Sequence, residues 1–359
     1  MTQDSGLRTQ DSGLRTNYAL MKYSTYNIGD EIQSIAAQRF LPHIDYYIDR
    51  EYLNAFHNNN HEKTKLILNG WFMHNPDNFP PSDEINPLLV SMHLWHENRD
   101  KLIMNGAVRD YLIHHGPVGC RDKSTMNFLL EHDVPAYFSG CMTTTMIPNM
   151  KLKSRREDEY ILCVDVKDEV YAHVKEKARK PVFRITKKCI QSDSMKRFKW
   201  AKMMLFMYHQ ASSVITMNLH TALPCLAFGT PVCLIEQEKY DGRFDGLDEL
   251  LFHCSEHEFI NGFYDINNPP ANKDSFIDMR NSLFETCRAF TGFDAGVPTL
   301  EDDYAPDMLS LLDILSMYGR AVNYLGGRRL LKEVLKKAIH KFFPSIVKDN
   351  PRISIIKGE

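Results

Sequence analysis

Short apolar runs alternate with segments of helical periodicity over most of the chain, starting near residue 18. The apolar runs fall at residues 18–25, 65–69, 88–93, 111–114 and 136–139 in the first half, and at 160–166, 181–185, 214–217 and 231–235 in the second. The helical segments include residues 31–40, 124–131, 194–208 and the short stretch 247–252. Strands that alternate with helices in this way predict parallel sheets with helices on both faces.

The alternation is interrupted once, by the charged segment KLKSRREDEY at residues 151–160, which is typical of a linker between domains. We therefore predict an α/β fold of GT-B type, with two Rossmann-like parallel-sheet domains facing a cleft. The predicted domains are residues 17–150 and 158–275. Residues 276–359 predict a C-terminal helical extension, with helices at 276–290, 306–318 and 328–343. In GT-B proteins such a helix often crosses back to the first domain.

The N-terminal residues 1–16 contain the unit TQDSGLR twice in succession, and we expect a disordered tail there. The chain has 359 residues with a net charge of -3, which gives no electrostatic argument for nucleic acid. No apolar run reaches the roughly 20 residues that span a bilayer, and no signal peptide is recognisable. The 8 cysteines form no CxxC pair. We expect reduced thiols, no zinc and a cytoplasmic location.

The most informative stretch is SSVITMNLHTALPCLAFGTPVCLIE, residues 212–236. An apolar run is followed by Asn218-Leu219-His220-Thr221, then by a helical segment ending at Gly229, then by a second apolar run. In open α/β sheets ligands bind where strands end and helices begin, and the free amides of a helix N-terminus favour an anion. Pro224 is expected in the first turn of the helix. His220 is therefore a candidate for an anion site, and its alternative role is to cap or pack at the turn.

Three segments of this chain resemble the polysaccharide pyruvyl transferase family. The stretch VITMNLHTALPCLAFGTPV is similar to the family signature of a strand, Arg-Leu-His, a small-residue helix and Gly-x-Pro. The segment NIGDE at residues 27–31 resembles the Asn-x-Gly-Asp turn of the family, and VGCRDKS at 118–124 resembles its Arg-Asp/Glu-x-x-Ser segment. The matches occur in the family order and cover roughly residues 20–250. One position departs from the pattern, because Asn218 stands where the family usually has arginine.

The resemblance implies that a pyruvyl group is transferred from phosphoenolpyruvate to two hydroxyls of one sugar, which forms a cyclic ketal. The acceptor would be a glycan of a surface polysaccharide, such as a capsule or exopolysaccharide, or its lipid-linked precursor. Such a reaction requires cations and helix-end amides for the phosphate and carboxylate, an acid to protonate the enol carbon, and a base for the sugar hydroxyl. It requires no cofactor and no metal, since the donor carries its own leaving group.

The expected donor site lies around His220, as phosphate ligand or general acid. By correspondence with the family, Asn218, Leu219 and Thr221 frame the same pocket. Arg121, at a strand-to-helix turn of the first half, is the preferred cation for the donor, although a pair with Asp122 is equally consistent with the sequence. Further cations would come from the second half, and Arg184 or Arg243 is expected to supply them; a surface position is the alternative for both.

The expected acceptor site lies at the first turn, where Asn27 and Gly29 precede Asp30 and Glu31. One of these two carboxylates is a candidate catalytic base, and helix capping is the competing role for Asp30. Trp71, at the end of KLILNGW, is expected to stack on an acceptor sugar, with a core position as its alternative.

Other sequence features leave alternatives open. His114 and His115 do not suggest a metal site, since neighbours on a strand point in opposite directions. The segment RRLLKEVLKKAIHKFF, residues 328–343, predicts an amphipathic helix that either docks on the protein or contacts the inner face of a membrane. A GT-B glycosyltransferase that uses a nucleotide sugar is the runner-up function, with Glu236 and Glu238 as its carboxylate pair. A non-catalytic glycan-binding relative is a third hypothesis, suggested by Asn218.

Overall fold

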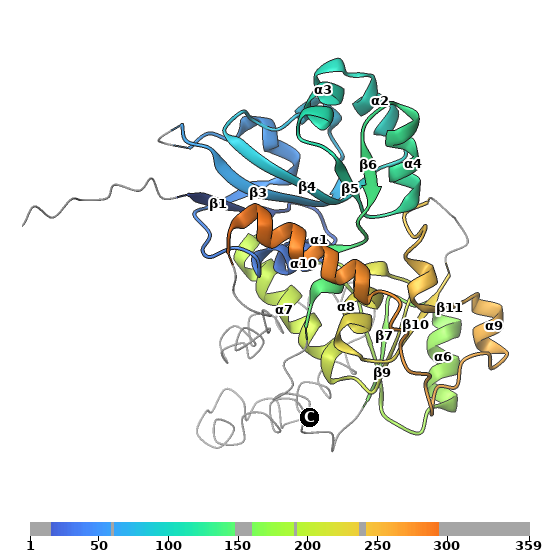
Figure 1. Ribbon diagram of the computed structural model, residues 1–359. Helices are drawn as coiled ribbons and strands as arrows, with labels where there is room; N and C mark the ends of the chain where they lie inside the picture. The colour runs from blue at the N-terminus through green and yellow to red at the C-terminus, as the bar shows by residue number, and fades with distance from the viewer. Residues whose placement is uncertain (1–15, 59–60, 148–159, 190–191, 237–241, 294–359) are drawn as a thin grey trace, which may run out of the picture.

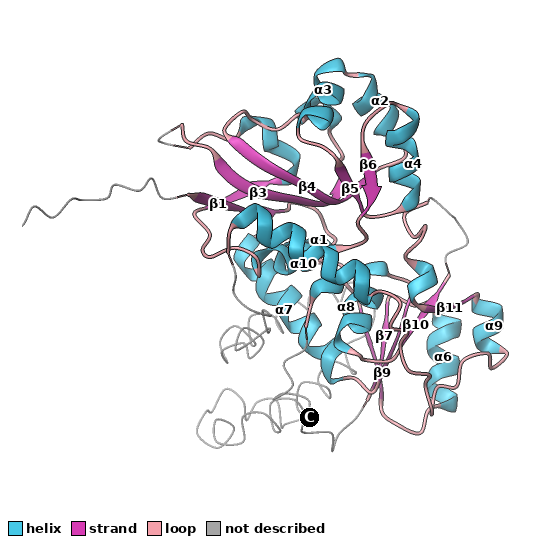
Figure 2. Ribbon diagram, viewed as in Figure 1, coloured by secondary structure: helices cyan, strands magenta, loops and turns pink. Residues whose placement is uncertain are grey.

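The computed structural model describes residues 16–58, 61–147, 160–189, 192–236 and 242–293. They form two parallel β-sheets with helices packed against them (Figures 1 and 2). The predicted α/β fold with two parallel-sheet domains is therefore confirmed. Among the described residues, no helix combines the length and the apolar character that a bilayer crossing requires.

The first sheet has six strands in the order β2-β1-β3-β4-β5-β6, and all neighbouring strands are parallel. Its strands are β1 (Asn17–Lys22), β2 (Tyr46–Asp49), β3 (Thr64–Phe72), β4 (Ile85–Leu94), β5 (Val118–Cys120) and β6 (Ala136–Phe138). The helices of this half are α1 (Gly29–Gln38), α2 (Arg99–Met104), α3 (Gly106–His114) and α4 (Lys123–Glu131), with 3-10 turns η1 (Arg50–Ala55), η2 (Pro76–Asn78) and η3 (Met142–Thr145).

The second sheet has five parallel strands in the order β11-β10-β9-β7-β8. Its strands are β7 (Ile161–Val164), β8 (Val182–Ile185), β9 (Ser213–Thr216), β10 (Val232–Ile235) and β11 (Phe252–Cys254). Its helices are α6 (Asp168–Lys177), α7 (Ser194–Gln210), α8 (Leu219–Phe228) and α9 (Glu256–Ile260), with the 3-10 turn η5 (Asp248–Leu250). Every residue of the central strands β7, β9 and β10 is buried, as expected for parallel strands covered on both faces.

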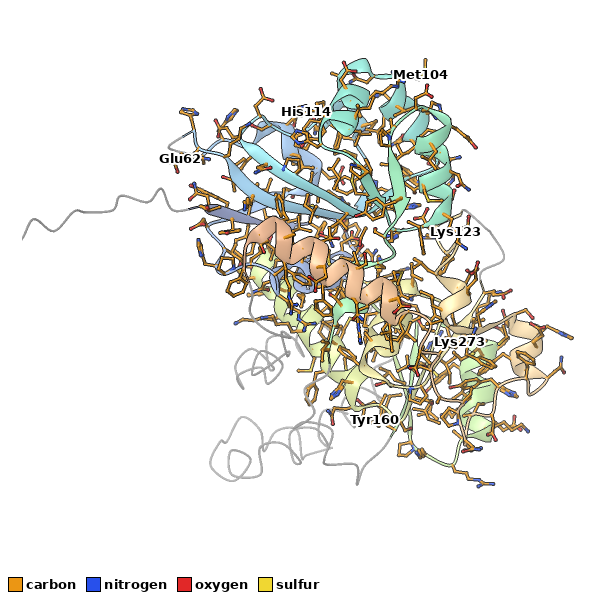
Figure 3. All side chains as sticks on the ribbon, in the orientation of Figure 1. Glu62, Met104, His114, Lys123, Tyr160 and Lys273 are labelled. Carbon is orange, nitrogen blue, oxygen red and sulfur yellow. The ribbon has the colours of Figure 1, made fainter. Side chains whose placement is uncertain are left out.

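The two domains contact each other through backbone and side chains. The loop after β1 meets the loop after β8, where Ile28 N donates to Lys187 O at 3.1 Å and Cys189 N donates to Tyr26 O at 2.8 Å. On the other side of this interface, Lys123 N at the start of α4 donates to Asp245 O at 3.0 Å, and Figure 3 shows Lys123 where the first domain faces the second. The carboxyl edges of the two sheets are thus held against each other.

The last described helix, α10 (Ile277–Thr291), returns to the first domain, as helices do at the C-terminus of GT-B proteins. It packs against the 3-10 turn η3 of the first domain. Tyr18 Oη on β1 donates to Thr291 O at 2.8 Å, and the ring of Phe284 meets that of Phe40 at 5.5 Å. The helix predicted at residues 276–290 is therefore confirmed, and it crosses back to the first domain.

Several predicted elements are wrong in detail. Residues 111–114 belong to helix α3 and not to a strand. The helix predicted at 247–252 is only a 3-10 turn over residues 248–250, and Phe252 already begins β11. Pro224 is the sixth residue of α8 and not part of its first turn, which begins after Asn218. Because proline has no N–H, the helix lacks one internal hydrogen bond there. The sequence prediction also missed β2 and α6.

Some predictions fall outside the described residues: the tail 1–16 except its last residue, most of the linker 151–160, and the helices at 306–318 and 328–343. The proposed domain boundaries stay a prediction, because the segments that would fix them, 1–15 and 148–159, are not described.

Candidate functional site

The candidate site is built from the ends of strands in both sheets. In the second sheet, β9 ends at Thr216 and α8 begins at Leu219, so Asn218 occupies the N-cap position. Asn218 makes no side-chain cap hydrogen bond to the helix, which leaves the start of α8 without the usual internal acceptor. In the first sheet, β5 ends at Cys120 and is followed at once by Arg121. The structure brings these two strand ends together.

His220 and Arg121 are in direct contact across the domain interface. Arg121 Nη1 lies 3.4 Å from His220 Nε2, and both side chains are buried, with exposures of 2% and 8%. Arginine is always a donor, so the imidazole accepts this hydrogen bond in its neutral form. Burial, followed by the charges of Arg121, Lys187 and Arg243, lowers the pKa of His220 well below its usual value.

The groups that depress the pKa of His220 are cations from both domains. Arg121 comes from the first domain, while Lys187 follows β8 and Arg243 follows β10 in the second. Lys187 is partly buried, and burial lowers its pKa while the charges of Asp165 and Asp30 act in the opposite direction. Positive charges that meet at a helix N-terminus are the arrangement that binds an anion.

Asn218 is bound to a carboxylate of the neighbouring strand. Its Nδ2 donates to Asp165 Oδ2 at 3.0 Å, and the backbone N of Lys187 donates to the same oxygen at 3.2 Å. Asp165 directly follows β7, so the ends of β7, β8 and β9 meet around this carboxylate. The positive charge near it comes from Lys187 and not from position 218.

Gly29 lets the first turn of α1 approach His220 closely. A Cβ atom built on Gly29 would lie 3.0 Å from His220 Nδ1 and 3.0 Å from Asn27 Oδ1. Asn27 Oδ1 already accepts a hydrogen bond from Gly29 N at 3.1 Å. The Asn-x-Gly-Asp turn is therefore packed directly against the histidine of the second domain.

The two acidic candidates of the first turn are both engaged in ion pairs. Asp30 Oδ2 lies 3.2 Å from Arg50 Nη1 and accepts a bond from Thr25 Oγ1 at 3.1 Å. The N-cap of α1 is Ile28, so Asp30 does not cap this helix. Glu31 pairs with Arg197 of α7 across the domain interface.

The pKa of Glu31 is raised from 4.5 to about 7 because it is buried, although the hydrogen bond and charge of Arg197 act against this shift. A carboxyl group with a pKa near neutrality can exchange protons at physiological pH. Its place in an ion pair between α1 and α7 also gives it a role in holding the domains together.

Trp71 lies near the end of β3, as expected, and its indole is half-buried. The guanidinium of Arg50 lies over it at 4.9 Å, and Trp95 and His74 approach it with centroid distances of 5.2 Å and 4.5 Å. The tryptophan is thus part of an aromatic group at the carboxyl edge of the first sheet.

Three other candidates are held by contacts away from His220. Arg184 pairs with Asp168 of α6 at 2.5 Å and donates to Val166 O at 2.6 Å. Thr221 Oγ1 meets Tyr208 Oη of α7 at 3.2 Å, and Leu219 is part of the main apolar core. The structure does not bring Arg184 to the residues around His220, so Lys187 and Arg243 are the nearer cations of the second domain.

The residues considered for a nucleotide-sugar site or a metal site have other surroundings. Glu236 pairs with His253 of β11 at 2.7 Å, and Glu238 lies outside the described residues. His114 lies on α3, at the end of the first domain far from the second in Figure 3. In the described part of the chain, no three His, Cys, Asp or Glu side chains are grouped as metal ligands.

The sequence prediction missed a buried histidine and a lysine at this site. His93 near the end of β4 lies 2.7 Å from Asp122 through its Nδ1, and Lys187 follows β8. Both occupy carboxyl ends of strands that the apolar pattern had located, at residues 88–93 and 181–185. The polar residues at those ends are the signal that would have found them.

Comparison with known proteins is consistent with this site. The family model described as polysaccharide pyruvyl transferase matches residues 27–238, which include both the first turn of α1 and the start of α8. Comparison with curated proteins found no match.

Two solved structures are weakly similar to this chain. One is a functionally uncharacterised protein, KP1_0663, from Klebsiella pneumoniae, with 13% identity, a TM-score of 0.40, and coverage of 64% of this chain and 87% of that one. The other is the wall teichoic acid polymerase TagF, with 8% identity, a TM-score of 0.34, and coverage of 84% and 90%. Scores at this level support no inference about this protein.

Proposed function

Because the chain belongs to the polysaccharide pyruvyl transferase family, we propose that it transfers a pyruvyl group from phosphoenolpyruvate to a sugar and forms a pyruvate ketal. Membership makes the chain a transferase with a polysaccharide acceptor. What we propose beyond family membership is that the donor is phosphoenolpyruvate and that the product is a ketal. The acceptor would be a surface polysaccharide such as a capsule or exopolysaccharide, or its lipid-linked precursor.

The observation that carries the proposal is the contact of Arg121 with His220 across the domain interface, on an imidazole whose pKa the charges of Lys187 and Arg243 also lower. Phosphoenolpyruvate brings a phosphate and a carboxylate, and these charges must be neutralised when they leave water. Cations from both domains, together with the free amides at the start of α8, offer that neutralisation without a metal. A neutral or weakly charged donor would not require three cations.

Lys187 accounts for the departure at position 218. Asn218 contributes a neutral amide and binds Asp165, so it cannot neutralise a phosphate. The backbone N of Lys187 donates to Asp165 Oδ2 at 3.2 Å, and the charge of Lys187 is one of those that lower the pKa of His220. We assign to Lys187 the charge that the family usually obtains from arginine.

His220 acts in this proposal as a ligand of the phosphate and as an acid. Without an anion its pKa is low, because burial and the surrounding cations disfavour the imidazolium. A bound phosphate reverses the sign of the local charge and raises that pKa. The imidazole then takes up a proton only when the donor is present.

The reaction forms and breaks bonds as follows. The methylene carbon of phosphoenolpyruvate gains a proton, and the first sugar hydroxyl adds to the adjacent carbon and loses its proton. The C–O bond to phosphate then breaks, the phosphate leaves with the electron pair, and the second hydroxyl adds to the same carbon. One hydroxyl proton is balanced by the proton gained at the methylene carbon, and the other leaves with inorganic phosphate.

Ligand-induced thermal stabilisation tests this function. Phosphoenolpyruvate at about 100 times its dissociation constant should stabilise the native state by about 2.7 kcal/mol, because it binds that state alone. A panel of nucleotide sugars is the comparison. Stabilisation by a nucleotide sugar and not by phosphoenolpyruvate would replace the proposed function by that of a glycosyltransferase. Stabilisation by neither, with binding of glycan, would favour the non-catalytic relative.

A further inference from the structure

A buried imidazole–carboxylate pair lies beside the candidate donor site. His93 Nδ1 is 2.7 Å from Asp122 Oδ2, and both residues are buried, with exposures of 3% and 0%. Asp122 Oδ1 also accepts a bond from Thr125 N at 2.9 Å and so caps α4. The carboxylate is fixed by the helix, and it fixes the imidazole in turn.

Asp122 is ionised in this pair. Burial alone would favour its protonated form, but the hydrogen bond and charge of His93 and the charge of Arg121 hold the pKa of Asp122 below its usual value. An ionised carboxylate accepts a proton-bearing Nδ1, so the proton chemistry of His93 runs through Nε2. This is the arrangement in which a carboxylate orients a histidine that acts as a base.

The strand register places His93 next to Trp71. Trp71 of β3 and His93 of β4 are direct partners in the parallel ladder, and neighbouring strands lie about 4.8 Å apart. The next residues, Phe72 and Leu94, pack into the core under α2, α3 and α4. Since successive side chains of a strand point to opposite faces, Trp71 and His93 both face the side that carries α1 and the second domain.

His93 is also connected to the donor site. Asp122 Oδ2 lies 3.7 Å from Arg121 Nε, and Arg121 Nη1 lies 3.4 Å from His220 Nε2. The charge of His93 is one of those that act on His220. A continuous set of side chains therefore leads from His93 through Asp122 and Arg121 to His220 of the second domain, and Trp71 is the strand partner of His93.

The aromatic side chains on the other side of His93 suit a sugar ring. Trp71 and Trp95 are half-buried with centroids 5.2 Å apart, and His74 is exposed and lies 4.5 Å from Trp71 and 5.8 Å from Trp95. Partly exposed indoles present an apolar surface with a polar edge, and pyranose rings have an apolar face that matches it. We define Trp71, Trp95 and His74 as the indole platform.

We propose that His93, oriented by Asp122, is the general base that removes the proton from the attacking hydroxyl of a sugar held on the indole platform. The inference rests on the proposed function and adds the acceptor side to it. The hydroxyl O–H bond breaks, its proton moves to His93 Nε2, and the oxygen forms a bond to the carbon that carries the phosphate. The proton is then released to solvent, and it balances the proton gained at the methylene carbon.

The first test is His93→Gln, assayed by phosphate released from phosphoenolpyruvate with a panel of p-nitrophenyl hexopyranosides as acceptors. Loss of a general base should lower the rate by about 100-fold or more. The dissociation constant of phosphoenolpyruvate should stay within a few-fold of wild type, because His93 does not bind the donor. His209→Gln is the matched control, since His209 is also buried but lies against Phe228, at the far end of α8 from His220.

The second test separates a base from a structural histidine. Asp122→Asn keeps an N-cap for α4, because asparagine caps as well as aspartate, but removes the negative charge beside His93. The charged and titratable groups that bear on His93 include Asp122, Arg121 and His220, and Thr125 Oγ1 also lies 3.3 Å from His93 Nδ1. A base must be unprotonated, so kcat/KM rises with pH through the pKa of His93. Loss of the carboxylate lowers that pKa and should move the rise to lower pH by about one unit.

The outcomes of the two proposals are distinguishable. If the wild-type protein releases no phosphate with any acceptor and does not bind phosphoenolpyruvate, the proposed function fails. If the wild type is active and His93→Gln retains its rate within a few-fold, His93 is not the base. An unchanged pH profile in Asp122→Asn would likewise overturn the role of the pair.

Discussion

At the scale of single residues, His220 is the residue of the site that is both buried and acted on by several charged side chains. Burial, followed by the charges of nearby cations that an anionic donor would neutralise, lowers its pKa and favours the neutral imidazole. A residue with this environment has a function in binding or proton transfer more often than in packing. The local sequence also favours a functional role, because His220 lies at the N-terminus of a helix and not within an apolar run.

We expect His220→Ala to lower the rate of pyruvyl transfer by about 100-fold or more while the protein stays folded. The measurement is phosphate release from phosphoenolpyruvate together with the thermal unfolding midpoint. His209→Ala, on α7, is the control for the loss of a buried imidazole. A rate for His220→Ala within a few-fold of wild type would contradict the assignment.

The residue-scale predictions from sequence succeeded where a motif marked the position. His220 and Arg121 were expected in the donor site and are in contact, while Gly29, expected on the acceptor side, lies against the same histidine. His93 and Lys187 were missed, since each is a single polar residue at a strand end and its partners are distant in sequence. Thirty or more residues separate Lys187 from His220, so their proximity depends on how β8 and β9 flank β7.

At the scale of elements, the first turn of α1 is shaped by the absence of a side chain at Gly29. We expect Gly29→Ala to displace His220, because the new Cβ would lie 3.0 Å from its Nδ1 and 3.2 Å from its Cβ. The predicted result is a loss of kcat/KM of about tenfold or more, since a small misplacement at a catalytic group is costly.

Gly106→Ala is the matched control, because Gly106 is likewise the first residue of a helix and a Cβ there would meet nothing within 4 Å. This control should keep wild-type kinetics, with stability unchanged or slightly increased. Equal kinetics for the two variants would show that Gly29 is not required for the approach of His220.

The helices α1 and α7 are joined by the pair of Glu31 and Arg197, and this contact should depend on pH. Glu31 has a pKa of about 7 in the folded protein, against an ordinary value of 4.5. The folded state therefore holds this proton more tightly than the unfolded state does. The stabilisation from protonated Glu31 is fully present below about pH 4.5 and is lost as the pH rises to about 7.

Denaturant unfolding of wild type and Glu31→Gln between pH 4.5 and 8 measures this effect. The difference in unfolding free energy, wild type minus variant, should fall over this range by an amount on the order of 3 kcal/mol, at about 1.4 kcal/mol for each pKa unit. A difference that stays constant with pH would mean that the folded state leaves the pKa of Glu31 unchanged.

The element-scale predictions depended on the length and clarity of the apolar pattern. Long helices such as α7 and α10, and buried strands such as β3 and β9, were predicted within a few residues. Residues 111–114 were assigned to a strand because a four-residue apolar run does not distinguish a strand from a turn of helix. The half-exposed β2 and the polar α6 gave a weaker signal, since few of their residues are buried.

At the scale of the whole molecule, α10 contributes to the packing between the two domains. Phe284 is buried and meets Phe40, next to the end of α1, while other residues of α10 share a core with α8 and η3. Removing a buried phenylalanine side chain costs about 3 kcal/mol or more. We expect Phe284→Ala to destabilise the protein by this amount, as measured by denaturant unfolding.

Phe263→Ala is the control, because this side chain is 59% exposed and its loss should change stability by less than about 0.5 kcal/mol. Equal unfolding free energies for the two variants would show that the contact of Phe284 with the first domain does not stabilise the protein. The architecture itself was predictable from the alternation of elements. The contacts of α10 with Phe40 and Tyr18 of the first domain were not, because contacts between residues so far apart in sequence do not affect local periodicity.

The central claim is that cations from both domains bind phosphoenolpyruvate at the start of α8. Titration calorimetry of phosphoenolpyruvate into wild type, Arg121→Ala, Arg121→Lys and Arg184→Ala tests it most directly. Arg121→Ala should raise the dissociation constant by about 30-fold or more, because one buried partner of an anion is lost. Arg121→Lys should restore binding only in part, since lysine lacks the planar fork of arginine. Arg184→Ala should bind as wild type does, because Arg184 is held against α6. Wild-type affinity in Arg121→Ala would contradict the account and would leave the donor site wholly in the second domain.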